Sequence, residues 1–278
     1  MIQRYKLPII VISGAVILFC LLYFGGRTKP LERANIDKSR ALKSESTINT
    51  NELVSKGLQD LSADSKATLQ ELEQQLQETT DPNVQTEILK KISGEWYQNN
   101  NYAASAIYAQ KVAESTGNEE SWSIAGTTYS ICYQRTQSPE LRSFCIDKAI
   151  NALEQAASLN PTSSSHKLNL ALAYVEKQPM AGIQMLLQIV KDEPENISAS
   201  MALGDMSVRS GQLEKAVERY KSVLDIDDRN FMANYNLAKT YQSMENKEQA
   251  LQYFQKSRSM TDNEALQSEI ESIIKTLK

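Results

Sequence analysis

The sequence predicts an all-α fold, and three observations lead to this prediction. Gly (10) and Pro (7) are scarce among the 278 residues, whereas Ala, Leu, Gln, Glu and Lys, which favour helices, are abundant. A single long apolar run lies near the N-terminus, and the C-terminal part is similar to itself at an offset of 34 residues. A hydrophobic content of 41% supports a folded core and excludes many membrane spans.

The first element is the apolar run from Leu7 to Phe24, which contains 18 residues and no charge. A helix of that length rises about 27 Å, which matches the hydrocarbon core of a bilayer. We therefore expect residues 1–26 to form a single transmembrane anchor. A cleaved signal peptide is the alternative, but its apolar region would be shorter, and only Gly25 and Gly26 are small residues after the run.

The orientation of this anchor depends on two groups of basic residues. Arg4, Lys6 and the α-amino group precede the run and favour a cytoplasmic tail, whereas six basic residues within 27–43 favour the opposite. A short tail with about three positive charges is hard to move across against the membrane potential. We therefore expect the rest of the chain on the extracytoplasmic, periplasmic side.

Charge is distributed unevenly along the chain. Residues 27–50 contain six basic and three acidic side chains without apolar periodicity, which is typical of a flexible basic linker. The overall net charge is −4, so residues 51–278 carry a net charge of −9. Phosphate binding needs Lys and Arg clustered on one face, and an acidic body therefore argues against a nucleic-acid ligand.

An amphipathic helical segment is expected at 51–82. A stripe of leucines runs along a Gln/Glu-rich helix from Asn51 to Thr80, and Asp81-Pro82 ends it. The stripe could pair with a second copy as a short coiled coil, but Ser65 and Thr68 interrupt the heptad. We therefore expect it to pack on the helices that follow. The leucines are Leu58, Leu61, Leu69, Leu72 and Leu76.

The most specific signal is the internal repeat, in which residues 234–262 align without a gap with residues 200–228. The matched pairs are Leu237 with Leu203, Ala238 with Gly204, Ala250 with Ala216, and Phe254 with Tyr220. These positions resemble the tetratricopeptide repeat, which has Leu-Gly and an aromatic residue on a first helix and Ala and an aromatic residue on a second. The resemblance implies an α-solenoid of stacked helix hairpins.

More degenerate units precede this pair. Leu170, Ala171 and Tyr174 match the first helix of a third unit, and Trp96 takes the aromatic position of the first. In the second unit, about 11 residues are inserted between Tyr129 and Ala149 relative to the family pattern. We therefore expect about five units over residues 83–262, followed by a capping helix at 263–278.

The resemblance also implies a binding surface, because the first helices of this family line a concave groove that holds an extended peptide or a partner helix. Carried over to this chain, the groove positions are Leu168, Leu172, Val175, Met201, Asp205, Val208, Arg209, Met232, Tyr235 and Lys239. We expect Ala at Tyr235 and Met201 together to weaken partner capture without unfolding the chain.

The family's carboxylate clamp is not expected here. Gly94 follows Lys90 where the clamp requires Asn, and Ile124 stands where the next amide should be. An apolar or amphipathic segment is therefore the expected ligand.

The cysteines leave two alternatives open. Cys132 and Cys145 lie symmetrically about the expected bend at Ser138-Pro139, so antiparallel helices would bring them to similar heights. A disulfide there would form only in an oxidising compartment. Two unpaired buried thiols are an equal alternative.

Catalytic and metal-binding patterns are not apparent in the sequence. The single histidine, His166, follows three serines at the start of an expected helix, and we expect it to be solvated. No HExxH motif, paired CxxC motif, Ser/His/Asp set or phosphate-binding glycine loop is apparent. We therefore expect no enzyme activity, cofactor, metal or small-molecule substrate.

These observations together indicate a membrane-tethered scaffold or adaptor that binds a protein or peptide partner in its groove. A constitutive structural subunit of a membrane-associated complex is the alternative, with the stripe at 58–76 as its oligomer contact. A helper of enzymes that act on the cell envelope is a third hypothesis.

Overall fold

The computed structural model describes residues 48–277. The expected anchor at Leu7–Phe24 and almost all of the expected linker at 27–50 lie outside the described residues. Among the helices of 48–277, none is both long enough and apolar enough to cross a bilayer.

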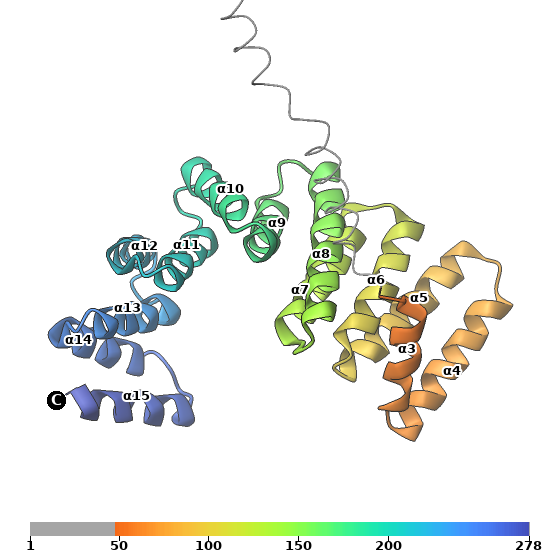
Figure 1. The fold of residues 1–278 in the computed structure, drawn as a ribbon, viewed down its shortest axis with the longest axis horizontal. Helices are drawn as coiled ribbons and strands as arrows, with labels where there is room; N and C mark the ends of the chain where they lie inside the picture. Colours follow the sequence, from red (N-terminus) through yellow and green to blue (C-terminus); the bar gives the residue numbers. More distant parts are fainter. Residues whose placement is uncertain (1–47, 278) are drawn as a thin grey trace, which may run out of the picture. The chain divides into compact units, whose positions relative to one another are not determined.

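The described residues form thirteen helices and no strands (Figure 1). The first helices of five hairpins are α5 (Pro82–Gln98), α7 (Glu119–Arg135), α9 (Ser164–Lys177), α11 (Ile197–Arg209) and α13 (Phe231–Ser243). The second helices are α6 (Tyr102–Thr116), α8 (Pro139–Leu159), α10 (Pro179–Asp192), α12 (Leu213–Ile226) and α14 (Lys247–Arg258). Two helices, α3 (Thr50–Gln59) and α4 (Ala63–Glu78), precede the hairpins, and α15 (Glu264–Leu277) follows them.

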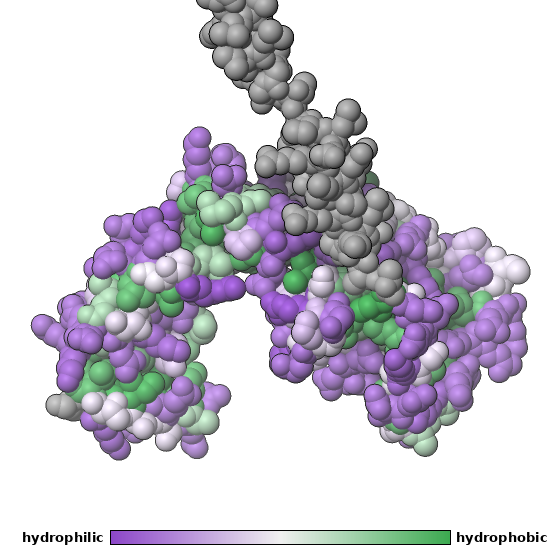
Figure 2. Space-filling model, in the orientation of Figure 1, coloured by the Kyte–Doolittle hydropathy of each residue, from purple (hydrophilic) through white to green (hydrophobic). Residues whose placement is uncertain are grey.

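Contacts between helices are mostly local in the chain. From α4 onward each helix packs on the next, and the first helices α7, α9 and α11 also contact one another in order. The core of residues 48–277 is accordingly divided into successive clusters and has no common centre. On the face drawn in Figure 2, hydrophobic residues appear as separate patches among hydrophilic ones. Such a one-dimensional arrangement is typical of a solenoid.

Short polar side chains define where the helices begin. The Oδ1 atom of Asn196 accepts the backbone N–H of Ala199 at 3.0 Å, and Asn230 accepts that of Ala233 at the same distance. These bonds satisfy N–H groups that have no partner within the helix. Gly211, with φ of +73°, makes the tight turn between α11 and α12.

The aligned positions of the repeat pack small residues against large ones. Tyr220 and Phe254 are fully buried in one cluster with Leu237 and Ala238. A Cβ atom on Gly204 would lie 2.5 Å from the Tyr220 ring, which is closer than atoms can approach. The glycine therefore allows α12 to approach α11 closely.

The insertion between Tyr129 and Ala149 lengthens two helices and does not form a loop. Helix α7 has 17 residues and α8 has 21, whereas α11 and α12 have 13 and 14. Pro139 occupies the first turn of α8, and Ser138 Oγ accepts the N–H of Leu141 at 3.2 Å. The second hairpin is therefore the longest.

The amphipathic segment differs from the single helix expected from Asn51 to Thr80. It forms α3 and α4, because Ser62 adopts an extended conformation and its Oγ accepts the N–H of Ser65, which starts a new helix. Leu69 is 1% exposed and packs in one cluster with Ile92 and Trp96, and the other four leucines of the stripe border that cluster. The stripe is thus covered by the following hairpin.

The C-terminal end of the solenoid is covered by α15. Ile270 and Ile274 are buried in the cluster that contains Phe254, and Arg258 pairs with Glu271 at 3.0 Å. The start of α15 at Glu264 agrees with the expected capping helix.

We predict opposite effects for alanine at two helix-interior glycines. Gly204→Ala should lower the free energy of unfolding by about 1–3 kcal/mol, because its Cβ would overlap the Tyr220 ring. Gly94→Ala should raise it by roughly 0.5–1 kcal/mol, because nothing lies within 4 Å of the added Cβ and Ala favours a helix. Urea unfolding followed by circular dichroism measures both, and equal effects would contradict this account of the packing.

Candidate functional site

Four of the ten predicted groove residues line one pocket of about 260 Å³ that opens mainly between α11 and α13. They are Asp205, Val208 and Arg209 on α11 and Lys239 on α13. Val208 is 38% exposed, and Arg209 and Lys239 are also exposed. We call this opening the α11–α13 pocket.

The inner wall of the α11–α13 pocket is a polar network. The Tyr220 hydroxyl donates to Asp205 Oδ1 at 2.6 Å, and Asn236 Nδ2 donates to the same oxygen at 3.1 Å. Burial, and next the hydrogen bond to the Asp205 carboxylate, raise the pKa of Tyr220 far above its usual range. Tyr220 is therefore a neutral donor, and Asp205 is already satisfied from inside.

The charges at the mouth of the α11–α13 pocket are less engaged. Arg209 Nη1 lies 3.5 Å from Glu176, and the same carboxylate also binds Arg142. Lys239 Nζ lies 5.5 Å from the centre of the Tyr235 ring. Both cations remain exposed beside Val208, so this surface combines an apolar patch with positive charge.

Three predicted groove residues have packing roles instead. Val175 is 4% exposed, because the backbone of Gly182 lies directly against it. Tyr235 stacks on Phe231, contacts Phe254 edge-on, and donates its hydroxyl to Glu269 of α15 at 3.2 Å. Met201 packs against the same cluster. Alanine at Tyr235 and Met201 would therefore remove packing contacts, so this pair is not a clean test of binding.

The remaining predicted positions do not share the α11–α13 pocket. Leu168 and Leu172 on α9 are partly buried against the neighbouring core cluster. Met232 at the start of α13 is 53% exposed. The predicted groove is thus only partly assembled as one surface.

A second pocket, of about 430 Å³, was not included in the sequence-based site. It lies between α5, α6 and α7, and we call it the Gly94 pocket. Its lining includes Gly94, Tyr97, Ala109, Val112, Ile124 and Thr128. In the family pattern, Gly94 and Ile124 stand only where clamp residues are missing, although a glycine inside a helix is itself a signal.

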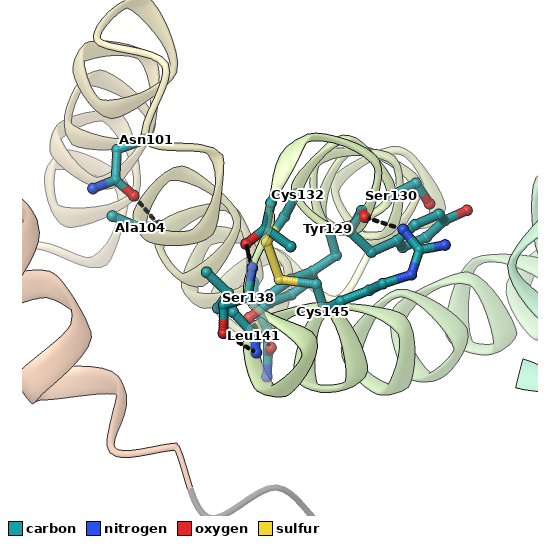
Figure 3. Close-up of a disulfide and its surroundings, with 12 residues drawn as sticks. Asn101, Ala104, Tyr129, Ser130, Cys132, Ser138, Leu141 and Cys145 are labelled. Carbon is teal, nitrogen blue, oxygen red and sulfur yellow. Dashed lines mark hydrogen bonds between the residues drawn. A yellow bond between two sulfur atoms is a disulfide. The ribbon is translucent and has the colours of Figure 1, made fainter. Parts of the chain in front are cut away.

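A disulfide joins Cys132 on α7 to Cys145 on α8, with the two Cα atoms 6.0 Å apart (Figure 3). The bond crosses the long second hairpin near the bend at Ser138, where the two helices are antiparallel. Both residues are buried, at 3% and 0% exposed. The structure thus contains the bonded form of the two that the sequence left open.

His166 is buried, contrary to the solvated environment that we expected. It is 9% exposed in the first turn of α9, and its Nε2 atom lies 3.9 Å from Glu119 of α7. Within residues 48–277, its Nδ1 atom has no hydrogen-bond partner. The packing of α9 on α7 covers this turn, which the sequence pattern alone does not show.

Within 48–277, no group of three or more His, Cys, Asp or Glu side chains is placed to hold a metal ion. The polar groups of the α11–α13 pocket contribute to the packing network and have no nucleophile–base arrangement.

Comparison with known families and structures agrees with this architecture. Residues 204–244 match a family described as TPR repeat, and residues 233–261 match the tetratricopeptide repeat family. No curated protein matches the chain by sequence at a significant level.

Three solved structures illustrate the similarity of fold. PilW, a widely conserved type IV pilus biogenesis factor, has a TM-score of 0.50 and 19% identity over 69% of this chain and 92% of its own. MamA 41-end from Desulfovibrio magneticus RS-1 has a TM-score of 0.47 and 17% identity over 63% of this chain and 94% of its own. YrrB, a TPR protein with an unusual peptide-binding site, has a TM-score of 0.44 and 18% identity over 66% of this chain and 91% of its own. The helix order and the family matches together show an all-α solenoid of helix hairpins, in which residues 204–261 match the tetratricopeptide repeat.

We predict that the disulfide contributes about 3 kcal/mol to stability, the value expected for a loop of this length. Reduction of the wild-type protein should lower its urea midpoint, and Cys132→Ala with Cys145→Ala should lower it similarly. The double variant should then be insensitive to reductant. A midpoint that reductant shifts equally in both proteins would show that this bond is not the cause.

A further prediction concerns the donor to Asp205. Tyr220→Phe should lower the free energy of unfolding by about 1.5–3 kcal/mol at pH 7, because Asp205 loses a hydrogen bond. Since folding raises the pKa of Tyr220, its contribution is complete below pH ~10 and declines as the pH rises further. The difference between wild type and variant should therefore narrow above pH ~10 in urea titrations. The exposed Tyr97→Phe, which leaves the hydrogen bond between Tyr220 and Asp205 intact, serves as the control for the loss of a tyrosine hydroxyl.

Proposed function

We propose that this chain is a non-catalytic, membrane-tethered scaffold that captures a protein or peptide segment against the first helices of its hairpins. The observation that carries the proposal is the α11–α13 pocket, where exposed Val208 lies beside Arg209 and Lys239. Each of these side chains projects from a first helix, and each is free of the core. A surface of this kind binds by contact and needs no reactive group.

The chemistry of the pocket mouth suggests what kind of segment binds there. Val208 offers an apolar contact, and the two cations beside it favour a carboxylate on the partner. Asp205 also lines the pocket, where Tyr220 and Asn236 bind one of its carboxylate oxygens, and the two cations outnumber this single negative charge. An amphipathic segment that carries an acidic residue next to an apolar one fits both features.

The membrane tether is proposed from the sequence. Leu7–Phe24 has the length and composition of one span, and Arg4 and Lys6 favour a cytoplasmic N-terminus. The disulfide between Cys132 and Cys145 supports an extracytoplasmic, periplasmic solenoid, because such bonds persist in oxidising compartments.

The alternative function, a constitutive subunit of a membrane-associated complex, relied on the leucine stripe at 58–76 as its oligomer contact. The leucine stripe at 58–76 packs on Ile92 and Trp96 of the same chain and is therefore not available as an oligomer contact.

We predict that Val208→Asp with Lys239→Glu lowers partner capture at least tenfold while the chain stays folded, because both side chains are exposed. Capture is measured by crosslinking in cells and quantitative mass spectrometry of the crosslinked proteins. The matched control makes the same changes on second helices, as Ile226→Asp with Lys247→Glu, and should capture as wild type does. Equal capture by the two double variants would contradict the proposed surface.

Removal of residues 1–26 should move the protein from the membrane fraction to the soluble fraction, because the only expected span is lost. The full chain should resist extraction with alkaline carbonate. In intact spheroplasts, added protease should digest the solenoid of the full chain if it is periplasmic. A protected solenoid would reverse the proposed orientation.

A further inference from the structure

Gly94 is set apart from the other glycines that lie inside helices of the solenoid. A Cβ atom on Gly126 would lie 2.5 Å from Leu153, and one on Gly204 would lie 2.5 Å from Tyr220. For Gly94, nothing lies within 4 Å. Close packing therefore explains the first two glycines and leaves Gly94 unexplained.

A glycine in this position has a cost for the fold. It lies in the middle of α5, where Gly is less favourable than Ala because it loses more backbone freedom on folding. The missing side chain leaves space that belongs to the Gly94 pocket. The absence of a Cβ atom thus enlarges a pocket and does not improve the packing.

Three of the hydroxyl groups that line the Gly94 pocket are already bonded within the protein. Ser93 Oγ donates to the carbonyl oxygen of Ser105 at 2.9 Å, Thr128 Oγ1 donates to that of Ile124 at 2.7 Å, and Thr116 Oγ1 donates to that of Val112 at 3.0 Å. These three hydroxyls therefore offer a ligand little further bonding, whereas Lys90, Asn118, Glu120 and Ser121 also line the pocket. The remaining contact surface comes from side chains such as Ala109 and Val112, which favours an apolar ligand group.

The mouth of the Gly94 pocket carries two large side chains that water contacts. Tyr97 is 46% exposed and Ile124 is 51% exposed, and they extend from α5 and α7 respectively. The Tyr97 ring is held edge-on against Tyr102, with ring centres 5.2 Å apart. Lys90, also at the mouth, is paired with Glu87 at 2.7 Å. A group inserted between Tyr97 and Ile124 would remove both from water.

The volume of the Gly94 pocket limits the size of the group. An apolar cavity of about 150 Å³ holds a benzene ring. The Gly94 pocket, at about 430 Å³, therefore has room for the largest apolar side chains and for part of the backbone that carries one.

We propose that the Gly94 pocket is a subsite for one bulky, uncharged apolar side chain of the partner segment, aromatic or leucine-like, and that Gly94 determines this specificity. The inference rests on the proposed function, because it assumes that the solenoid captures a segment of a partner. It adds a second contact, on the first two hairpins, that is separate from the α11–α13 pocket.

The test uses a random dodecapeptide library displayed on phage, selected against the full chain in lipid nanodiscs after depletion on empty nanodiscs. Gly94→Leu fills the pocket from α5, and Ile124→Ser removes its exposed wall on α7 without touching Gly94. Ile226→Ser changes another exposed isoleucine, on α12, and is the matched control: Ile226 is 41% exposed and Ile124 is 51% exposed. Circular dichroism and thermal melting show that each variant is folded, and Gly94→Leu should melt no lower than wild type.

The expected result is a set of peptides that share one Trp, Phe, Leu or Met. Replacement of that residue by Ala, or the use of Gly94→Leu or Ile124→Ser, should raise the Kd of the synthetic peptides at least tenfold. Ile226→Ser should leave the Kd unchanged.

Two results would overturn the inference. One is that the selected peptides bind wild type and Gly94→Leu equally, or accept Lys at every position. The other is that no selected peptide distinguishes these two proteins. Peptides that bind Gly94→Leu normally but fail to bind Val208→Asp with Lys239→Glu would remove only this subsite and leave the proposed function intact.

Discussion

The structure depends on close contact between neighbouring helices, in which a small residue on one admits a large residue from the next. Tyr220 can pack on α11 only because Gly204 has no side chain, and Leu153 packs on α7 for the same reason at Gly126. A single hairpin cannot bury its apolar face alone, so each covers the next and the ends need separate covers. Helices α4 and α15 provide them through Leu69 and Ile270.

Much of this architecture could be predicted from the sequence, because the small and large residues recur at fixed spacing. The repeat predicted the hairpins from α11 to α14, whose residues 204–261 also match the family. What it could not supply is the identity of the neighbours outside the repeat. Tyr235 occupies a groove position of the family pattern, yet α15 covers it in this chain. His166 is buried for a similar reason, because α7 lies beside it.

The candidate site also shows that the family pattern does not predict which helices lie beside a given residue. Val208, Arg209 and Lys239 were found from the family pattern and do share a pocket, whereas Val175 belongs to the core because Gly182 brings α10 close to it. The family pattern did not predict the Gly94 pocket, because that pattern specifies which side chains should be present at each position. Its signal is a missing side chain, and the meaning of a glycine depends on what surrounds it in three dimensions, which for Gly94 is open space.

The mostly local contacts between helices have a consequence for how the two pockets would act together. The Gly94 pocket is built on α5, α6 and α7, and the α11–α13 pocket on α11, α12 and α13, so no helix takes part in both. Occupation of one has no shared element through which to reshape the other. A single extended ligand that reached both would instead gain by avidity: the first contact would raise the effective concentration for the second, and two weak contacts would give durable attachment.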